Sequence, residues 1–225
     1  MTSEPYHISP SVYCVGGPNL SHNYDCLVYL IVGDRNLILV DSGAGVGNSF
    51  GRIISNIEWL GFQPENLKFI LVTHEHIDHI GALTRFKEHF QSKIVAHSEA
   101  VSAIQTADLK RTAADYYGVD LKPCKVDIVL PGSAGMIIED PPIYYLHTPG
   151  HTPGSVVFYF NDKNLRVLFG HDIHGPFNAR WDSDKTLWRA SLRKLLDLEA
   201  DILCEGHYGV FEGEKVKEFI TSFLQ

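Results

Sequence analysis

The chain of 225 residues lacks the features that mark membrane-spanning and nucleic-acid-binding proteins. Its longest apolar run, residues 27–32, has the length of a strand and falls far short of the roughly 20 residues that cross a bilayer. Only 19 basic residues stand against 27 acidic ones, and the resulting net charge of −8 disfavours a partner with a phosphate backbone. We therefore expect neither a membrane nor a nucleic acid among its partners.

Cysteine is scarce as well, and its spacing excludes the usual zinc-binding pairs. No C-x-x-C pair occurs among the four cysteines, Cys14, Cys26, Cys124 and Cys204. We interpret them as buried, reduced thiols rather than as disulfides or zinc ligands. Residues 1–5 lack the charged head and the apolar stretch of a secretory signal, so the sequence predicts a cytoplasmic protein.

The sequence does contain a dense group of metal-ligand residues directly after an apolar segment. Residues 73–79 read THEHIDH and follow the apolar run 69–72. Side chains of an extended segment repeat with a period of two, so His74 and His76 point to the same side. The turn into the next amphipathic run, which is predicted to be a single helix through Ile80 and Phe90, directs Asp78 and His79 towards a second point. Imidazole and carboxylate are the ligands expected for zinc, iron or manganese, and the motif therefore predicts a metal site.

The predicted elements repeat once along the chain. Each half runs hairpin, helix, strand, histidine and helix, and the second half begins after the loop at residues 147–154. This order predicts an α/β fold, a four-layer αββα sandwich made of two pseudo-repeated halves. With 44% hydrophobic residues and no Ser/Gly-rich linker, residues 1–225 are expected to form a single domain.

A helical insert separates the two halves. Residues 98–118 are predicted to form two helical pieces, with Ser98 and Asp108 as N-caps and Gly118 as the stop. We expect this insert to lie near the site and to influence the choice of substrate.

Ligand-type residues also occur at the ends of the later strands. His151 lies in a loop rich in proline and glycine, Asp172 ends the second hairpin, and His207 follows the last predicted strand. Together with the H-x-H-x-D-H motif, this order of residues closely resembles the metallo-β-lactamase superfamily, and the resemblance covers nearly the whole chain.

The resemblance implies a site for two metal ions with seven ligands. The first metal would be held by His74, His76 and His151. The second metal would be held by Asp78, His79 and His207. Asp172 would bridge the two metals. Asp78 and Asp172 are also the candidate catalytic residues. The implied cofactors are two divalent cations, with zinc as the first choice and iron or manganese as alternatives, because nitrogen and oxygen ligands accept several metals.

Other residues near these ligands have two readings each. Asp41 either orients a metal-bound histidine or serves as a turn acid or helix cap. His171 and His174 flank Asp172 and are interpreted as surface or outer-layer histidines, since both metals already have full ligand sets. A loop containing Asn19 and His22 could cover the site. Three aromatic residues line an apolar substrate pocket or simply pack beside the core: Phe177, Trp181 and Tyr208.

The leading hypothesis is a dinuclear metal-dependent hydrolase of a small ester, thioester or lactone, with phosphodiester or phosphotriester hydrolysis as a side or main activity. Residues 148–155 look most like the glyoxalase II and persulfide dioxygenase branches of the superfamily. The first alternative is a mononuclear iron persulfide dioxygenase, and the second is a metal-binding protein without turnover. A small-molecule substrate is the expected partner, and the sequence leaves open whether the chain forms a homo-oligomer.

Overall fold

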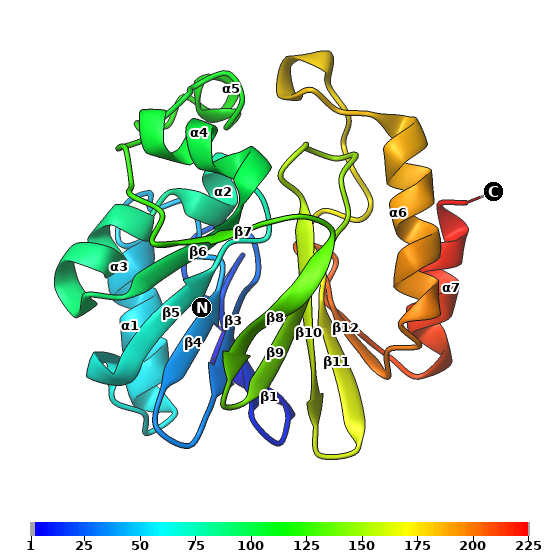
Figure 1. The fold of residues 1–225 in the computed structure, drawn as a ribbon. Helices are drawn as coiled ribbons and strands as arrows, with labels where there is room; N and C mark the ends of the chain where they lie inside the picture. The colour runs from blue at the N-terminus through cyan, green and yellow to red at the C-terminus, as the bar shows by residue number, and fades with distance from the viewer. Residues whose placement is uncertain (1–2, 225) are drawn as a thin grey trace.

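A computed structural model describes residues 3–224 as two β-sheets that face each other, with helices on both outer sides (Figure 1). The strands of the first sheet follow the chain order: β1 (Tyr6–Ser9), β2 (Val12–Gly16), β3 (Val28–Val32), β4 (Leu37–Val40), β5 (Leu67–Leu71), β6 (Lys93–His97) and β7 (Ile128–Leu130). The second sheet has the order β13 (Val210–Glu212), β12 (Ile202–Cys204), β11 (Leu165–Phe169), β10 (Val156–Asp162), β9 (Pro142–His147) and β8 (Ala134–Glu139).

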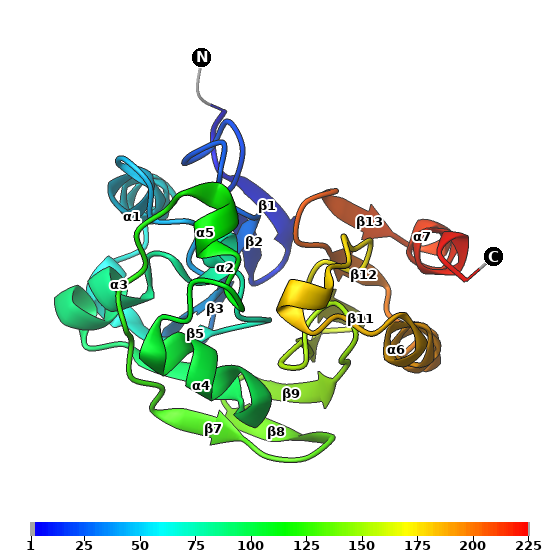
Figure 2. The same cartoon turned by 90° about the horizontal axis from the view of Figure 1, so that it is seen from above.

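The helices complete the outer layers (Figure 2). The first sheet carries α1 (Ser49–Trp59), α2 (Ile77–Ile80), α3 (Leu83–Phe90), α4 (Ser98–Thr106) and α5 (Ala114–Tyr117). The second sheet is covered by α6 (Lys185–Asp197) and α7 (Glu214–Ser222). The structure also contains two 3-10 turns, η1 (Pro64–Asn66) and η2 (Ala179–Trp181). The predicted αββα sandwich is thus confirmed. Within residues 3–224, no helix is long and apolar enough to span a bilayer.

The two halves share the same connectivity. An antiparallel hairpin continues through a helix into a parallel strand, first as β3–β4–α1–β5 and again as β10–β11–α6–β12. Because the carboxyl ends of parallel neighbours meet at one edge of a sheet, the loops after β4 and β5, and those after β11 and β12, open at shared edges. All the predicted metal ligands except His151 lie in connections of this kind, and His151 lies in the β9–β10 loop.

The core explains why several strands are apolar throughout. In β3, Val28 and Leu30 pack against the helices of the first sheet, whereas Tyr29 and Ile31 pack against the second sheet. Side chains alternate between the two faces of a strand, so a strand buried on both faces must be apolar at every position. The same alternation occurs in β10, where Phe158 faces the first sheet.

The structure corrects two predicted helix features. The predicted single helix through Ile80 and Phe90 is two helices, α2 and α3, because the chain passes very close to a neighbouring loop at Gly81. A Cβ atom on Gly81 would lie 2.0 Å from the carbonyl oxygen of Ala44, so this loop displaces the continuous helix. The N-cap of α4 is His97 rather than Ser98, and its ring nitrogen accepts a hydrogen bond from the Glu99 amide.

The second helical piece of the insert also begins later than predicted. Asp108 does not cap α5. Its carboxylate accepts hydrogen bonds from the amides of Lys110 and Arg111 and so closes a turn before the helix. The N-cap of α5 is Ala113, while Gly118 ends the helix in the left-handed conformation, as predicted. The short edge strands β1 and β13 were not predicted.

Candidate metal centre

All seven predicted ligands meet at one end of the sandwich, in two groups that share Asp172. Within each group, one ligand atom from every residue lies within 4.8 Å of the others. The groups are His74, His76, His151 and Asp172, and Asp78, His79, His207 and Asp172. The structure therefore brings together the residues that the sequence nominates, from both halves of the chain. That they bind metal stays a prediction at this point.

The end of β5 divides the histidine motif between the two groups. β5 ends at Leu71, the chain bends at Thr73, and His76 has an extended backbone as the N-cap of α2. Asp78 and His79 lie inside α2 and therefore point in another direction. The insert fixes this helix from outside, because the Ile77 amide donates a hydrogen bond of 2.8 Å to the Thr112 carbonyl.

The first group is a cluster of buried, neutral imidazole rings. His76 Nδ1 lies 2.9 Å from His151 Nε2, and the ring of His74 is centred 4.7 Å from each of their rings. Burial lowers the pKa of His76 and of His151 to about 3. Both rings are therefore unprotonated at neutral pH and can offer lone pairs to a cation.

The second group consists of histidines paired with carboxylates. Asp172 Oδ1 lies 3.1 Å from His79 Nε2 and 3.2 Å from His207 Nε2. Burial acts to raise the pKa of Asp172, but the charges of His207 and His79 outweigh it and hold that pKa well below its usual range. Burial likewise acts to lower the pKa of His207, whereas the carboxylates of Asp172 and Asp78 raise it to about 10.

The donor set fits divalent cations. His74 Nε2 is buried and has no hydrogen-bond partner within residues 3–224. His76 Nε2 is in the same situation. A buried unpaired polar group costs about 1–3 kcal/mol, and a cation would satisfy both atoms. Imidazole nitrogen and carboxylate oxygen are ligands that zinc takes in proteins.

Asp41 contacts a predicted ligand, His79, which favours the interpretation that Asp41 orients a histidine of the site. Its Oδ2 lies 2.8 Å from His79 Nδ1, and its carboxylate also accepts hydrogen bonds from the amide and the hydroxyl of Thr73. A carboxylate on Nδ1 keeps the proton there and leaves Nε2 for a cation. His151 is held in the same way, because its Nδ1 donates to the Pro176 carbonyl at 2.8 Å.

Sequence reasoning missed the role of Glu75, which lies between the first two histidines of the motif. Its carboxylate is fully buried and accepts hydrogen bonds from Arg111 Nη2 at 2.8 Å and from Thr152 Oγ1 at 2.7 Å. Glu75 thereby joins the motif to the insert and to the loop that carries His151. The available signal was an ionisable residue inside a motif that directly follows a buried strand.

Glu205 was missed too, although it stands two residues before a predicted ligand. Its Oε2 accepts hydrogen bonds from the amides of His207 and Tyr208, and its Oε1 lies 2.7 Å from His174 Nδ1. This buried carboxylate therefore shapes the loop that presents His207. The contact with Glu205 also agrees with the interpretation that His174 lies around the ligands and is not itself one of them.

The remaining candidates divide between site and packing. His171 is buried, and its Nε2 lies 3.1 Å from the Thr148 hydroxyl, so it is not a surface residue. The ring of Trp181 is centred 4.6 Å from that of His76 and forms a wall of the site. Phe177 packs on Trp188 at 4.7 Å, which favours the packing interpretation. Tyr208 is exposed beside His174.

Comparison with known proteins identifies the class of protein. The family model of the metallo-beta-lactamase superfamily matches residues 23–207, and the chain belongs to this superfamily. It is 29% identical to the probable metallo-hydrolase YqgX of Bacillus subtilis, over 80% of this chain and 83% of that protein. It is 30% identical to the hydroxyacylglutathione hydrolase GloC of Haemophilus influenzae, over 79% of this chain and 82% of that protein.

A solved structure supports the same assignment. The fold matches the crystal structure of the metallo-beta-lactamase GOB-18 from Elizabethkingia meningoseptica with a TM-score of 0.81 and 27% identity, covering 99% of this chain and 88% of that one. Family and relatives together make the chain a metal-dependent hydrolase in the general sense.

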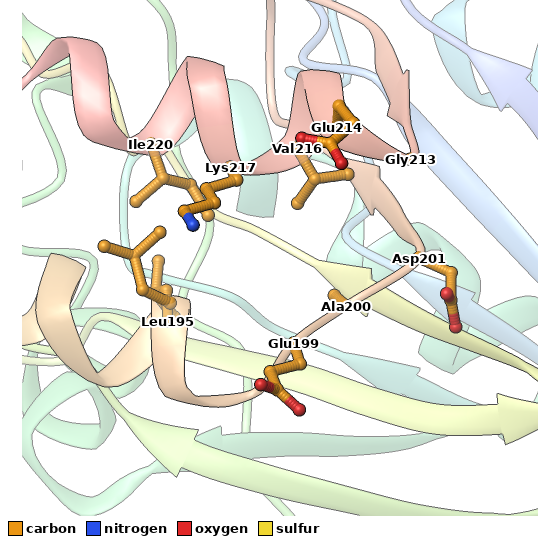
Figure 3. Close-up of a pocket in the computed structure, with 10 residues that line it drawn as sticks. Leu195, Glu199, Ala200, Asp201, Gly213, Glu214, Val216, Lys217 and Ile220 are labelled. Atoms are coloured by element: carbon orange, nitrogen blue, oxygen red, sulfur yellow. The ribbon is translucent and has the colours of Figure 1, made fainter.

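A separate cavity lies away from these ligands, between α6 and α7 (Figure 3). It has a volume of about 470 Å³, and its apolar wall includes Leu195, Val216 and Ile220. None of the seven predicted ligands lines this cavity, so it is distinct from the candidate metal centre.

Proposed function

We propose that the protein hydrolyses a small ester, thioester or lactone at a centre for two divalent cations, with zinc as the first choice. The observation that carries this proposal is the pair of ligand groups that share Asp172. When bound, such cations supply an activated water and polarise the carbonyl oxygen of the substrate. The chain then needs no serine or cysteine nucleophile. The cysteine beside the site, Cys26, is unsuited to that role because burial raises the pKa of its thiol.

The surrounding residues hold and order the reacting groups. Asp172 faces both groups, with Oδ2 at 3.5 Å from His151 Nε2 and Oδ1 at 3.1 Å from His79 Nε2, and so keeps them in register. The candidate catalytic carboxylates are Asp78 and Asp172, which we expect to accept the proton of the attacking water. The side chain of His207 is 29% exposed, so solvent reaches the second ligand group at this residue.

The first experiment measures metal content per chain by mass spectrometry, on protein purified without added metal or chelator. We expect about two metals per chain, matching the two ligand groups. A single iron with the second group empty would contradict the dinuclear proposal and favour persulfide oxidation, to be followed by oxygen uptake. Hydrolysis of a panel of esters, thioesters, lactones and phosphodiesters then narrows the substrate.

Asp172→Ala tests the shared ligand. We expect the hydrolytic rate of this variant to fall by more than about 100-fold, which is more than the loss of a residue that only supports a metal ligand usually causes. The variant should also bind less metal while remaining folded. Circular dichroism checks the fold, and Asp34→Ala, which removes an exposed carboxylate in the β3–β4 turn, is the matched control. Near-normal turnover by Asp172→Ala would contradict the assignment.

A further inference from the structure

We propose that four aromatic side chains beside the metal centre select the non-reacting part of the substrate, and that they favour an uncharged, apolar or aromatic group over a charged thiol such as glutathione. These side chains, here called the aromatic arc, are Trp181, Tyr116, Tyr117 and Tyr24. The inference rests on the proposed hydrolysis and names its substrate class.

The arc runs outward from the first ligand group as a chain of ring contacts. Trp181 contacts the ring of His76 at 4.6 Å between centroids and that of Tyr116 at 6.3 Å. Tyr117 continues the chain, at 5.4 Å from Tyr116 and 6.2 Å from Tyr24. All these contacts are edge-to-face, within the range in which aromatic rings attract each other. One end of the arc therefore touches a metal ligand, and the other reaches the surface.

The outer members of the arc are unusually exposed for large apolar side chains. Tyr116 is 73% exposed, Tyr24 49% and Tyr117 40%, whereas Trp181 is buried at the base. Single exposed aromatic residues need no explanation, but a contiguous exposed patch marks a binding surface. Here the patch adjoins the candidate metal centre, where a substrate with a scissile carbonyl would extend across it.

The pKa of Tyr117 is raised, which keeps its phenol uncharged. Burial is the largest cause of this shift, and the carboxylates of Asp78 and Asp172 add to it. Together they raise the pKa of Tyr117 to about 12. The phenol is therefore neutral at pH 7 and presents an uncharged face to a substrate. The arc thus touches the first ligand group through Trp181.

The arc is assembled from the two halves of the fold. Tyr116 and Tyr117 belong to α5, Trp181 belongs to η2, and the two segments meet above the sheets, where Figure 2 shows α5 in green and residues 179–181 in gold. The ion pair of Arg180 Nη2 with Asp115 Oδ2 joins the two segments, and Arg111 Nε lies 3.8 Å from Asp182 Oδ2, too far for a hydrogen bond.

These ion pairs also decide which substrates the arc accepts. Arg180 and Arg111, the guanidinium groups beside the arc, are each already paired with a carboxylate, and Arg111 also holds the buried Glu75. Glutathione carries two carboxylates and one ammonium group, so its distal end would compete with Asp115 and Asp182 for these cations. An apolar or aromatic group meets no such competition and gains contact with the tyrosine rings.

The test compares two thioesters with the same scissile bond in the metal-loaded enzyme. One is the lactoyl thioester of benzyl mercaptan, and the other is the lactoyl thioester of glutathione. We expect kcat/KM to be at least about tenfold higher for the benzyl thioester, a preference that contacts with several aromatic rings can supply. The double variant Tyr116→Ala/Tyr117→Ala should lose this preference through a lower kcat/KM for the benzyl thioester, while keeping the wild-type metal content.

Tyr144→Ala is the matched control, because Tyr144 is a similarly exposed tyrosine on β9 that stacks on Tyr159 and is not part of the arc. Its preference should equal that of the wild type. Equal or better hydrolysis of the glutathione thioester by the wild type would overturn the inference and leave the proposed hydrolysis standing.

A binding measurement separates the inference from the proposed reaction. N-benzylacetamide should change the intrinsic tryptophan fluorescence saturably in the wild type but not in the double variant, and S-methylglutathione should not do so in either. Failure to hydrolyse any ester, thioester or lactone would overturn the proposed function, whatever the binding result. Absence of saturable benzylacetamide binding would overturn the role of the arc, whatever the activity.

Discussion

Two histidines on opposite sides of the candidate metal centre differ in protonation. His151 belongs to the first group, and burial lowers its pKa to about 3. His207 belongs to the second group, where the carboxylates of Asp172 and Asp78 outweigh burial and raise its pKa to about 10. A cation must displace the proton of His207 but finds His151 already unprotonated. The two groups should therefore respond differently to pH.

We predict that filling the second group releases at least about one proton per cation at pH 7, whereas filling the first group releases few. Because the raised pKa of His207 keeps its proton below pH 10, zinc affinity of the second group should increase from pH 6 to pH 8, by up to about tenfold per pH unit for each proton released. Titration calorimetry in two buffers of different ionisation enthalpy measures this. His207→Gln is the control that removes the proton, and a second site with pH-independent affinity would contradict the prediction.

At the scale of the element, α2 is too short to be stable by itself and depends on its neighbours. The Ser42 amide and hydroxyl both donate to the His79 carbonyl, at 2.8 and 2.9 Å, and the Cys26 amide donates to the Asp78 carbonyl. Gly81 allows these contacts, since the chain passes against Ala44 immediately after the helix. The position of two ligands is thus set by loops from elsewhere in the chain.

Gly81→Ala should push α2 away from the loop at Ala44, because its Cβ would clash with backbone atoms that cannot turn aside. We expect a loss of about 1–3 kcal/mol in the free energy of unfolding and weaker binding of the second cation. Denaturant unfolding and metal analysis measure the two effects.

Gly61→Ala is the control for this prediction, because a Cβ added to Gly61, at the end of α1, would meet no atom within 4 Å. Its backbone is left-handed, so the variant should lose some stability but keep the wild-type metal content. Unchanged metal content in Gly81→Ala would contradict the account of α2.

At the scale of the whole molecule, the candidate metal centre joins the two halves of the sandwich. The first half contributes His74, His76, Asp78 and His79, the second contributes Asp172 and His207, and the β9–β10 loop of the second sheet adds His151. A cation bound between them interacts only with the folded arrangement. Metal binding should therefore stabilise the whole fold rather than a single loop.

We predict that chelation lowers the thermal unfolding midpoint. For a cation present at 1,000 times its Kd, the lost stabilisation is about 4 kcal/mol per site. Calorimetry with and without chelator measures the shift, and the Asp172→Ala variant should show a smaller one because it binds less metal. Equal midpoints with and without chelator in the wild type would contradict the prediction.

Local patterns made much of the fold predictable. The buried strand β5, the hairpin β3–β4 and the helix α1 each carry their own periodicity or turn residues, and their order repeats in the second half. The seven predicted ligands could be nominated from the sequence because four of them fall in one short motif. By contrast, β13 has only three residues, and its pairing with β12 depends on the neighbouring strand rather than on its own sequence.

The amino-acid sequence by itself determined the class of fold, the superfamily and the nominated ligands, because these follow from short-range spacing and from the order of motifs. Only the tertiary structure decided how Asp41 holds His79, how Glu75 joins Arg111 to Thr152, and how α5 meets η2 over the centre. Each of these contacts joins residues at least 36 positions apart, the separation of Glu75 and Arg111. Distances between such residues are set by the packing of the two sheets, which no local pattern encodes.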